Sequence, residues 1–196
     1  MSQILQLPLA RPVPGRDHVQ GSPVARVAVV EYGDFECPSC AQARPALRIM
    51  VQHFQPDVCL VYRHFPLVET HPHAIMAAEA SEAAAAQGKF WAMHDALFQR
   101  ELHLNRNEIN RCALAANLDM MRFEREMASG EHRARVEEDI QSGRANHVMS
   151  TPAIFLNGEL CDVSFGMEHL HHAIEQVLAG GGPTHEPVGG GYAKTR

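Results

Sequence analysis

The sequence predicts an α/β fold interrupted by a long, all-helical insertion, and three observations predict it. A β-branched apolar run, a helical run and a second apolar run follow one another between residues 24 and 65, as in a parallel β-α-β unit. Residues 72–147 show only helical periods. A strand pattern then returns at residues 151–156, and a final helix follows.

Length and charge limit the classes of function. The chain has 196 residues, with 17 Lys and Arg against 23 Asp and Glu and a formal net charge of −6. This length suits one domain, and 45% hydrophobic with 20% charged residues is typical of a globular chain. A net negative chain without a basic block argues against nucleic acid or an anionic membrane as the main partner.

The first half carries the β-α-β pattern. Residues 24–32 are β-branched and apolar, which is typical of a strand buried on both faces. Apolar residues then recur at helical spacing over residues 38–54, where Pro45 predicts a kink. Residues 58–65 form the second expected core strand.

The second half returns to strands after the insertion. Gly88 is expected to end the first, Ala-rich helix of the insertion. Asn157-Gly158 stands between two apolar runs, which is a strong signal for a hairpin turn. Residues 167–178 are expected to form the closing helix.

These patterns give the expected domain organisation. Residues 1–16 are rich in Pro and Arg without periodicity, and we expect a loosely ordered arm. Residues 180–196 are Gly-rich, which predicts a flexible tail. The core domain is expected at 17–66 and 148–179, with the helical insertion at 67–147 between its two parts.

The cysteines and the N-terminal residues bear on compartment. No basic segment precedes an apolar run at the start, and no window approaches the ~20 apolar residues of a membrane span. We therefore expect a cytoplasmic protein without a membrane partner. Five cysteines are an odd number, which favours one functional pair plus three thiols over a disulfide framework.

Cys37-Pro38-Ser39-Cys40 stands where a strand is expected to end and a helix to begin. Two cysteines three residues apart in a first helical turn lie on one face and can close a disulfide. Cys37 meets the unpaired N–H groups and the positive end of the helix dipole, which stabilise a thiolate. Pro38 suits the first helical position. Cys40 is expected to be more deeply buried and to resolve the mixed disulfide that Cys37 forms.

A zinc site is the rival interpretation of this spacing. A tetrahedral zinc site normally needs a second ligand pair, and the other cysteines, Cys59, Cys112 and Cys161, are single. Redox chemistry is therefore favoured over metal binding. The three single cysteines are expected to be small buried hydrophobic residues, with an accessory redox thiol as the rival interpretation of Cys161.

Two distant features strengthen the redox hypothesis. Glu31 lies within the apolar strand run, where burial would raise its pKa and let it accept the Cys40 proton. The alternative is a solvated carboxylate at the strand end. Pro152 opens a strand-like segment, which a cis Thr151–Pro152 bond would explain. Thr151 is then expected to offer its backbone to an extended substrate chain.

These residues carry a resemblance. VVEYGDFECPSC, YRHFPL, HPHAIMAAEASEAAAAQGKFWAMHDALF and STPAIFLNG occur in this order, and they resemble the DsbA-like family of thioredoxin-fold thiol-disulfide oxidoreductases over roughly residues 18–178. The resemblance implies a thioredoxin-like fold with an inserted helical cap. It implies Cys37 as nucleophile, Cys40 as resolving cysteine, Glu31 as buried acid and Pro152 as cis-proline. It also implies a partly apolar groove for a protein or peptide substrate.

One residue departs from the family pattern. The periplasmic oxidant that gives the family its name has a histidine between its cysteines, whereas this chain has Ser39, an uncharged and weaker donor. Cys37 is then expected to keep a higher pKa and to oxidise substrates less strongly. This favours a reductase or isomerase over an oxidase. No tightly bound cofactor is expected, and a redox partner, either glutathione or a thioredoxin-type reductant, is expected to recycle the pair.

Two other functions remain open. One is a glutathione-dependent isomerase or transferase on a related thioredoxin scaffold, which would tolerate loss of Cys40. The other is a non-catalytic peptide- or metal-binding module. His169 and His172 have ligand spacing, but histidines on a helix face are mostly solvated, so no metal site is expected. His94 is expected to be a hydrogen-bonded core residue. Three further side chains are candidates to approach the dithiol: Arg44, Arg63 and His64.

Overall fold

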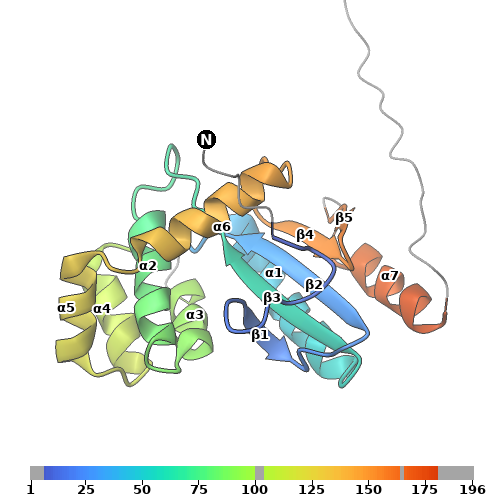
Figure 1. The fold of residues 1–196 in the computed structure, drawn as a ribbon, viewed down its shortest axis with the longest axis horizontal. Helices are drawn as coiled ribbons and strands as arrows, with labels where there is room; N and C mark the ends of the chain where they lie inside the picture. The colour runs from blue at the N-terminus through green and yellow to red at the C-terminus, as the bar shows by residue number, and fades with distance from the viewer. Residues whose placement is uncertain (1–6, 100–103, 164–165, 181–196) are drawn as a thin grey trace, which may run out of the picture.

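A mixed five-stranded sheet forms the centre of the molecule (Figure 1). The computed structural model describes residues 7–99, 104–163 and 166–180. The strands are β1 (His18–Gly21), β2 (Val27–Gly33), β3 (Val58–His64), β4 (Ala153–Leu156) and β5 (Glu159–Cys161). Their order in the sheet is β1-β3-β2-β4-β5. β2 and β3 run parallel, and the other neighbouring strands pair antiparallel.

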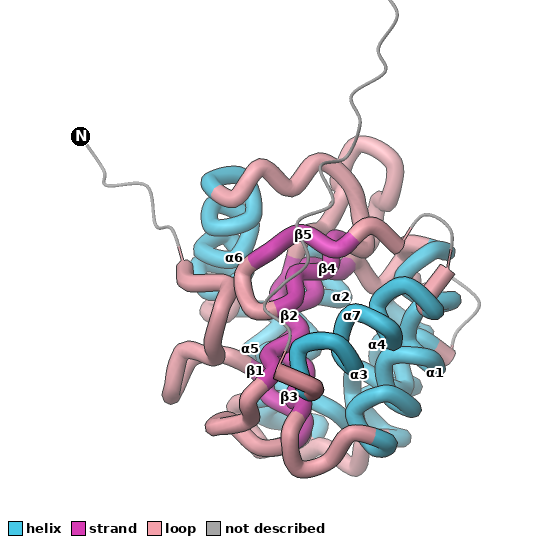
Figure 2. Tube along the Cα trace, turned by 90° about the vertical axis from the view of Figure 1, so that its right-hand side faces the viewer, coloured by secondary structure: helices cyan, strands magenta, loops and turns pink. Residues whose placement is uncertain are grey.

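Helices cover both faces of the sheet. The first face carries α1 (Pro38–His53) and α7 (Glu168–Leu178), and α6 (Arg133–Ala145) packs on the other (Figure 2). Four more helices form the cap beside the sheet: α2 (Ala74–Ala85), α3 (Phe90–Phe98), α4 (Arg106–Ala115) and α5 (Met120–Ser129). Within the described residues, no helix is both long and apolar enough to cross a membrane.

The alternation of side chains along β2 determines which residues lie under α1. All seven residues of β2 are buried, as expected for a central strand covered by helices on both sides. Val27 and Val29 pack in the core under α1 and α7, whereas Val30 and Tyr32 pack on the opposite face. Glu31 follows Val29 by two residues and therefore faces α1.

The cap and the sheet share one hydrophobic core. Phe35 and Tyr62, from the sheet side, pack with the alanines of α2 and with Met93 and Leu97 of α3. The loop that carries Phe35 leads directly into the dithiol motif. The cap is thereby fixed next to the start of α1.

The expected α/β fold with an inserted helical cap is confirmed. The first expected core strand, β2, begins at Val27 rather than at Val24, which is 82% exposed. β1 was not predicted, because HVQG carries no apolar alternation and forms a strand only by pairing with β3. Such pairing is a tertiary effect that a local pattern does not carry.

The N-terminal segment differs from the loosely ordered arm expected at residues 1–16. Leu7 is buried, and its N–H donates to Ser142 Oγ at 3.2 Å. Arg63 donates to the carbonyl of Pro8 at 2.9 Å. Residues 7–16 are therefore anchored to β3 and α6 by long-range hydrogen bonds. Residues 1–6 and most of the expected tail, 181–196, lie outside the described residues.

Gly143 lets α6 approach the sheet closely, and Gly143→Ala is expected to destabilise the protein. A Cβ at this position would lie 2.5 Å from Phe65 Cδ2 and 3.3 Å from Tyr32 Cδ1. Overpacking of this kind costs about 1–3 kcal/mol, more than the roughly 0.5–1 kcal/mol that alanine gains in a helix. Urea unfolding should show a lower midpoint for Gly143→Ala. The exposed neighbour Gln141→Ala is the matched control, and equal midpoints would contradict the close packing.

Candidate dithiol active site

The dithiol stands at the start of α1, directly beyond the end of β2. Cys37 is the N-cap of α1, with φ −81° and ψ 121°, and Pro38 occupies the first helical position. Among the described residues, no side chain caps this helix, so its first N–H groups are available to the Cys37 sulfur. Cys37 and Cys40 are both buried and both free thiols.

Cys37 is the thiol that ionises easily. A hydrogen bond from the Cys40 thiol lowers the pKa of Cys37 to about 5, with help from Thr151 and from the N–H groups of Cys40 and Ser39, and against the opposing effect of burial. As a neutral thiol, Cys37 Sγ lies 3.3 Å from the Thr151 carbonyl oxygen. At neutral pH, Cys37 is therefore mainly a thiolate, the form that attacks disulfides.

Cys40 has the opposite character. Burial raises the pKa of Cys40 far above its ordinary range, and so do its hydrogen bond to Cys37 and the negative charge of Glu31. The thiol has no solvent exposure. Cys40 therefore keeps its proton until Cys37 loses its negative charge, which gives the two thiols distinct roles.

Glu31 lies beneath the start of α1 and is 2% exposed. Burial, the largest cause, and the charge of Cys37 together raise the pKa of Glu31 to about 8, against the opposing effect of Arg44. Within the described part of the chain, Glu31 Oε1 has no hydrogen-bond partner. A carboxyl group with a pKa near neutral next to a dithiol is suited to accept and return a proton.

A small cavity connects Glu31 with α3. Its volume is about 10 Å³, and its lining includes Glu31, Arg44, His94 and Asp95. That volume suits about one water molecule. His94 Nε2 is a second buried atom without a hydrogen-bond partner among the described residues. Glu31 and His94 thus both line a cavity of the size of one water molecule.

An ion pair beside this cavity joins α1 to α3. Arg44 Nη2 lies 2.6 Å from Asp95 Oδ1, and His94 Nδ1 lies 3.1 Å from the same oxygen. Burial lowers the pKa of His94 to about 4, so this ring is neutral at physiological pH. His94 is hydrogen-bonded and buried, as the sequence predicted. Arg44 is the arginine that acts on Glu31 and partly stabilises its charged form.

Arg63 and His64 contact other groups. Arg63 is on the sheet face opposite the dithiol, where its guanidinium donates to Asp17 Oδ2 at 2.8 Å and to Tyr32 Oη at 3.2 Å. His64 Nε2 pairs with Glu82 Oε1 at 2.9 Å. The strand alternation separates Arg63 from the first face, so its charge is neutralised by Asp17 rather than by Cys37.

Thr151 and Pro152 lie beside the dithiol. The Thr151–Pro152 peptide bond is cis, and it directly precedes β4, which pairs with β2. Thr151 is 8% exposed, and its hydroxyl has no hydrogen-bond partner among the described residues. The Thr151 carbonyl therefore faces Cys37, while its hydroxyl is available to donate to the thiolate.

Two acid–histidine pairs in the loop before Cys37 were not found in the sequence. Asp34 Oδ2 lies 2.6 Å from His71 Nδ1 and accepts from the Leu67 N–H at 2.8 Å. Glu36 Oε2 accepts from the His73 N–H at 2.7 Å. These contacts fasten the dithiol loop to the segment that leads into the cap. The equal two-residue spacing of the acids and of the histidines was the available signal.

The three remaining cysteines lie elsewhere. Cys59 and Cys112 are fully buried, as expected, whereas Cys161 is only half-buried. Burial raises the pKa of Cys59 to about 11 and also raises that of Cys161. Neither thiol has the activating environment of Cys37.

Comparison with known proteins agrees with this geometry. A family model described as thioredoxin matches residues 14–176. A thioredoxin-like oxidoreductase from Silicibacter pomeroyi is 27% identical, with a TM-score of 0.72 over 84% of this chain and 94% of that one. BdbD from Bacillus subtilis is 20% identical, with a TM-score of 0.76 over 89% of this chain and 99% of that one. The thiol-disulfide exchange protein alpha-DsbA2 from Wolbachia pipientis is 14% identical, with a TM-score of 0.74 over 84% and 88%.

The curated proteins that are similar in sequence are named as antiporters rather than as oxidoreductases. Na(+)/H(+) antiporter NhaA 1 from Salinispora arenicola is 42% identical over 167 residues, which are 85% of this chain and 26% of that protein. NhaA from Herminiimonas arsenicoxydans is 40% identical over 177 residues, or 90% of this chain and 28% of that protein. The chain spans about a quarter of the length of these relatives.

Proposed function

The chain belongs to the thioredoxin family, and on this premise we propose that it is a thiol-disulfide oxidoreductase acting on protein or peptide substrates through Cys37 and Cys40. The observation that carries the proposal is the contrast between the two thiols. Cys37 has a pKa of about 5, whereas Cys40 is held protonated above a buried carboxyl group. Cys37 is the attacking thiolate and Cys40 the protonated resolving thiol, the two roles that disulfide exchange requires.

In the reducing direction, the Cys37 thiolate attacks a substrate disulfide and forms a mixed disulfide, and one substrate sulfur leaves as a thiolate. Cys37 has then lost its charge, so the thiol of Cys40 becomes easier to ionise. The loss of the Cys37 charge also removes one cause of the raised pKa of Glu31, so Glu31 ionises more readily. Its carboxylate then accepts the Cys40 proton, and the Cys40 thiolate attacks Cys37 Sγ. The second substrate sulfur leaves, and the protein holds a Cys37–Cys40 disulfide. In the oxidising direction the same steps run in reverse.

The direction of electron flow depends on the reduction potential of the dithiol, which rises as the reduced form with its Cys37 thiolate is stabilised. A pKa of about 5 for Cys37 lies between the values of about 7 for thioredoxin and about 3.5 for a strong oxidant. A value above that of the strong oxidant agrees with the expectation from Ser39, and the Cys40 thiol, Thr151 and the backbone N–H groups lower the pKa of Cys37 from its ordinary value. We propose an intermediate redox poise, which suits an isomerase better than a strong reductase.

Substrate binding is proposed at the surface around Pro38, Ser39, Thr151 and Pro152. Thr151 places backbone groups next to Cys37, which supports pairing with an extended chain. Met149, two residues before Thr151, is 87% exposed and adds apolar surface. No tightly bound cofactor is proposed. Glutathione is the proposed recycling partner, in the cytoplasmic compartment that the sequence predicts.

The relatives named as antiporters raise the question of ion transport. The matched region makes up about a quarter of those proteins, and its reactive geometry is a dithiol. We therefore propose disulfide exchange, rather than ion antiport, for this region.

A peptide assay tests the proposed activity. A peptide with a non-native pair of disulfides, incubated with glutathione, should rearrange faster with the wild-type protein than without it. Cys37→Ser should reduce the rate to that of glutathione alone, because the attacking thiolate is lost. Cys161→Ser is the matched control and should retain full activity. Equal rates for wild type and Cys37→Ser would exclude the dithiol as the catalyst.

A further inference from the structure

Two histidines and one carboxylate converge where the cap meets the sheet. His18 of β1 and His64 of β3 direct their Nε2 atoms at the same oxygen, Glu82 Oε1 of α2, at 2.8 and 2.9 Å. The three potential ligand atoms all lie within 4.8 Å of one another. Two imidazoles and one carboxylate are a common ligand set for zinc and other divalent transition metals.

The strand pairing explains how this cluster forms. β1 pairs antiparallel with β3, and His18 lies opposite Tyr62. His64 follows Tyr62 by two residues, so both histidines lie on the same face of the sheet as diagonal neighbours. α2 of the cap packs against this edge and adds Glu82. The three residues are far apart in the sequence and come together only in the folded domain.

The side chains are held in place before any ion binds. His64 is fully buried, and Glu82 is 6% exposed. The His18 ring stacks on Phe90, with 3.5 Å between the ring centroids and an interplanar angle of 6°. Ligands that are fixed by packing lose little freedom on binding an ion, which favours affinity.

A cavity gives an ion access to this cluster. Its volume is about 670 Å³, and its lining includes His18, Glu82, Phe90 and Trp91. His64 lies behind these residues, away from the solvent. A metal held by three protein atoms keeps an open coordination position, and here the cavity can supply a solvent ligand or a small anion to that position.

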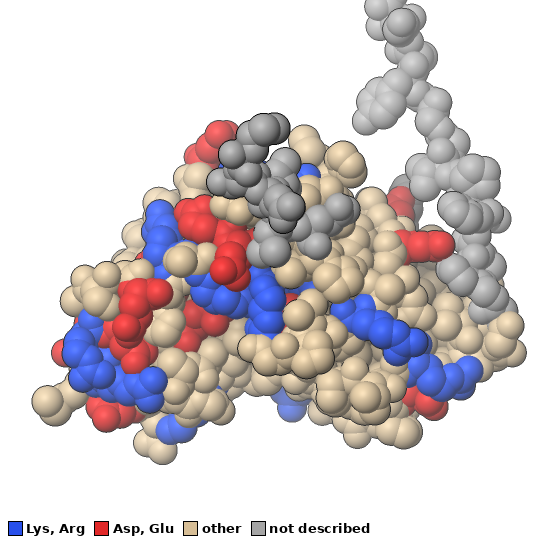
Figure 3. All heavy atoms as spheres, viewed as in Figure 1, with Lys and Arg blue, Asp and Glu red and all other residues tan. Residues whose placement is uncertain are grey.

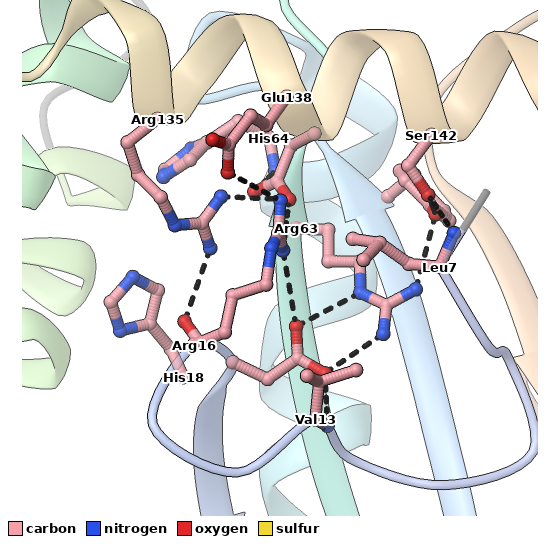
Figure 4. A network of polar contacts seen from close by, with 12 residues as sticks. Leu7, Val13, Arg16, His18, Arg63, His64, Arg135, Glu138 and Ser142 are labelled. Atoms are coloured by element: carbon pink, nitrogen blue, oxygen red, sulfur yellow. Dashed lines mark hydrogen bonds and ion pairs between the residues drawn. The ribbon is translucent and has the colours of Figure 1, made fainter. Parts of the chain in front are cut away.

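The arginines around the cluster pair mainly with acids other than Glu82, so they leave its carboxylate available to bind an ion. Arg135 lies 3.9 Å from Glu82 Oε1, but it pairs more closely with Asp139, at 2.8 Å, and donates to the Arg16 carbonyl. Arg16 and Arg63 bind Asp17, and Arg16 also binds Asp139 and Glu138 (Figure 4). Three arginines therefore face three other acids, and the close partners of Glu82 Oε1 are the two histidines, with Lys89 also on the cavity lining.

The protein surface beyond this cluster carries mixed charge. On the face shown in Figure 3, basic and acidic side chains alternate over the cap side and do not form one large area of a single sign. A long-range field would therefore do little to concentrate cations here. The selectivity must come from the ligand set itself.

We propose that His18, His64 and Glu82 form a binding site for a divalent transition-metal ion, separate from the dithiol. The ion would replace the two hydrogen bonds to Glu82 Oε1 by metal–ligand bonds. It would link β1, β3 and α2 and so fasten the cap to the sheet. A second group, Glu126, Glu131 and His132, has one imidazole and an exposed Glu131, and it serves as the internal comparison.

Zinc titration of the oxidised protein tests the proposal. With Cys37 and Cys40 joined in a disulfide, these sulfurs no longer compete for the metal. Calorimetry should show one strong zinc site per chain in the wild type. His18→Gln and Glu82→Gln should each weaken this site at least tenfold, whereas the control His132→Gln should leave it unchanged. His18 is partly exposed, so its replacement perturbs the core less than a change at His64.

A spectroscopic readout identifies the ligands directly, and a measurement of thermal stability complements it. Cobalt bound to the wild type should give the visible absorption of a four- or five-coordinate site, and this absorption should be lost in His18→Gln. Zinc should also raise the thermal unfolding temperature of the wild type but not that of His18→Gln. Absence of a strong site in the wild type, or an equally strong site in both His18→Gln and Glu82→Gln, would overturn the proposal.

Discussion

Replacing Glu31 with glutamine is expected to stabilise the reduced protein increasingly as the pH rises from 4.5 to 8. The pKa of Glu31 is raised from 4.5 to about 8, chiefly by burial. Below pH 4.5 the carboxyl group is protonated in the folded and unfolded states alike, so its ionisation does not lower the free energy of unfolding. Above that pH only the unfolded state ionises freely, so the wild type loses stability until about pH 8. At about 1.4 kcal/mol per pH unit, the loss is roughly 3–5 kcal/mol.

Urea unfolding of wild type and Glu31→Gln at several pH values measures this effect. The difference in unfolding free energy should be small at pH 4 and largest near pH 8. Glu159→Gln, at an exposed position of β5, is the matched control and should show no such trend. A difference between wild type and Glu31→Gln that is independent of pH would mean that Glu31 is ionised in the folded protein.

The same substitution should slow the exchange reaction. Glutamine cannot accept a proton, so Cys40 would have to lose its proton directly to water. General acid–base catalysis typically contributes roughly 10²-fold or more, and a loss of that order is expected in the resolution step, with Cys37 alkylation still rapid. Rapid resolution in Glu31→Gln would show that another group accepts the Cys40 proton.

Replacing Cys40 with serine is expected to trap the protein in covalent complexes with its substrates. Cys37 still attacks a disulfide, but no second thiol is available to resolve the mixed disulfide. Non-reducing gels should therefore show stable adducts that reducing agents release. The double variant Cys37→Ser/Cys40→Ser is the matched control and should form none.

This experiment also separates the three functions that the sequence left open. Adduct formation with loss of turnover supports dithiol exchange. Full activity of Cys40→Ser with glutathione would indicate a glutathione-dependent isomerase or transferase, which needs one thiol. No adducts and no change in peptide binding would indicate a non-catalytic module.

The sequence predicted the parts of the site that depend on local patterns. The CxxC spacing, the end of a buried strand and the start of a helix are all visible within residues 24–54. Glu31 stood out because a carboxylate in an apolar strand has a large desolvation cost. Each of these signals is a short-range rule, and the structure places Cys37, Cys40 and Glu31 together.

The parts that were missed depend on long-range pairing. The Asp34–His71 and Glu36–His73 contacts join residues 37 positions apart. His18 meets Glu82 across 64 positions, through a β1 strand that has no strand pattern of its own. The helix start in the sequence predicted a stabilised Cys37 thiolate, but the hydrogen bonds from Cys40 and Thr151 that also lower the pKa of Cys37 depend on the folded site.

The central claim is that Cys37 and Cys40 form a reversible disulfide, and redox titration tests it most directly. The protein is equilibrated in glutathione buffers, free thiols are alkylated, and the modified cysteines are located by mass spectrometry. Cys37 and Cys40 should titrate together as one two-electron couple, at a potential between about −270 mV for a thioredoxin and about −120 mV for a strong oxidant, nearest to about −180 mV for an isomerase. If no reversible Cys37–Cys40 disulfide forms at any potential in this range, the claim is wrong.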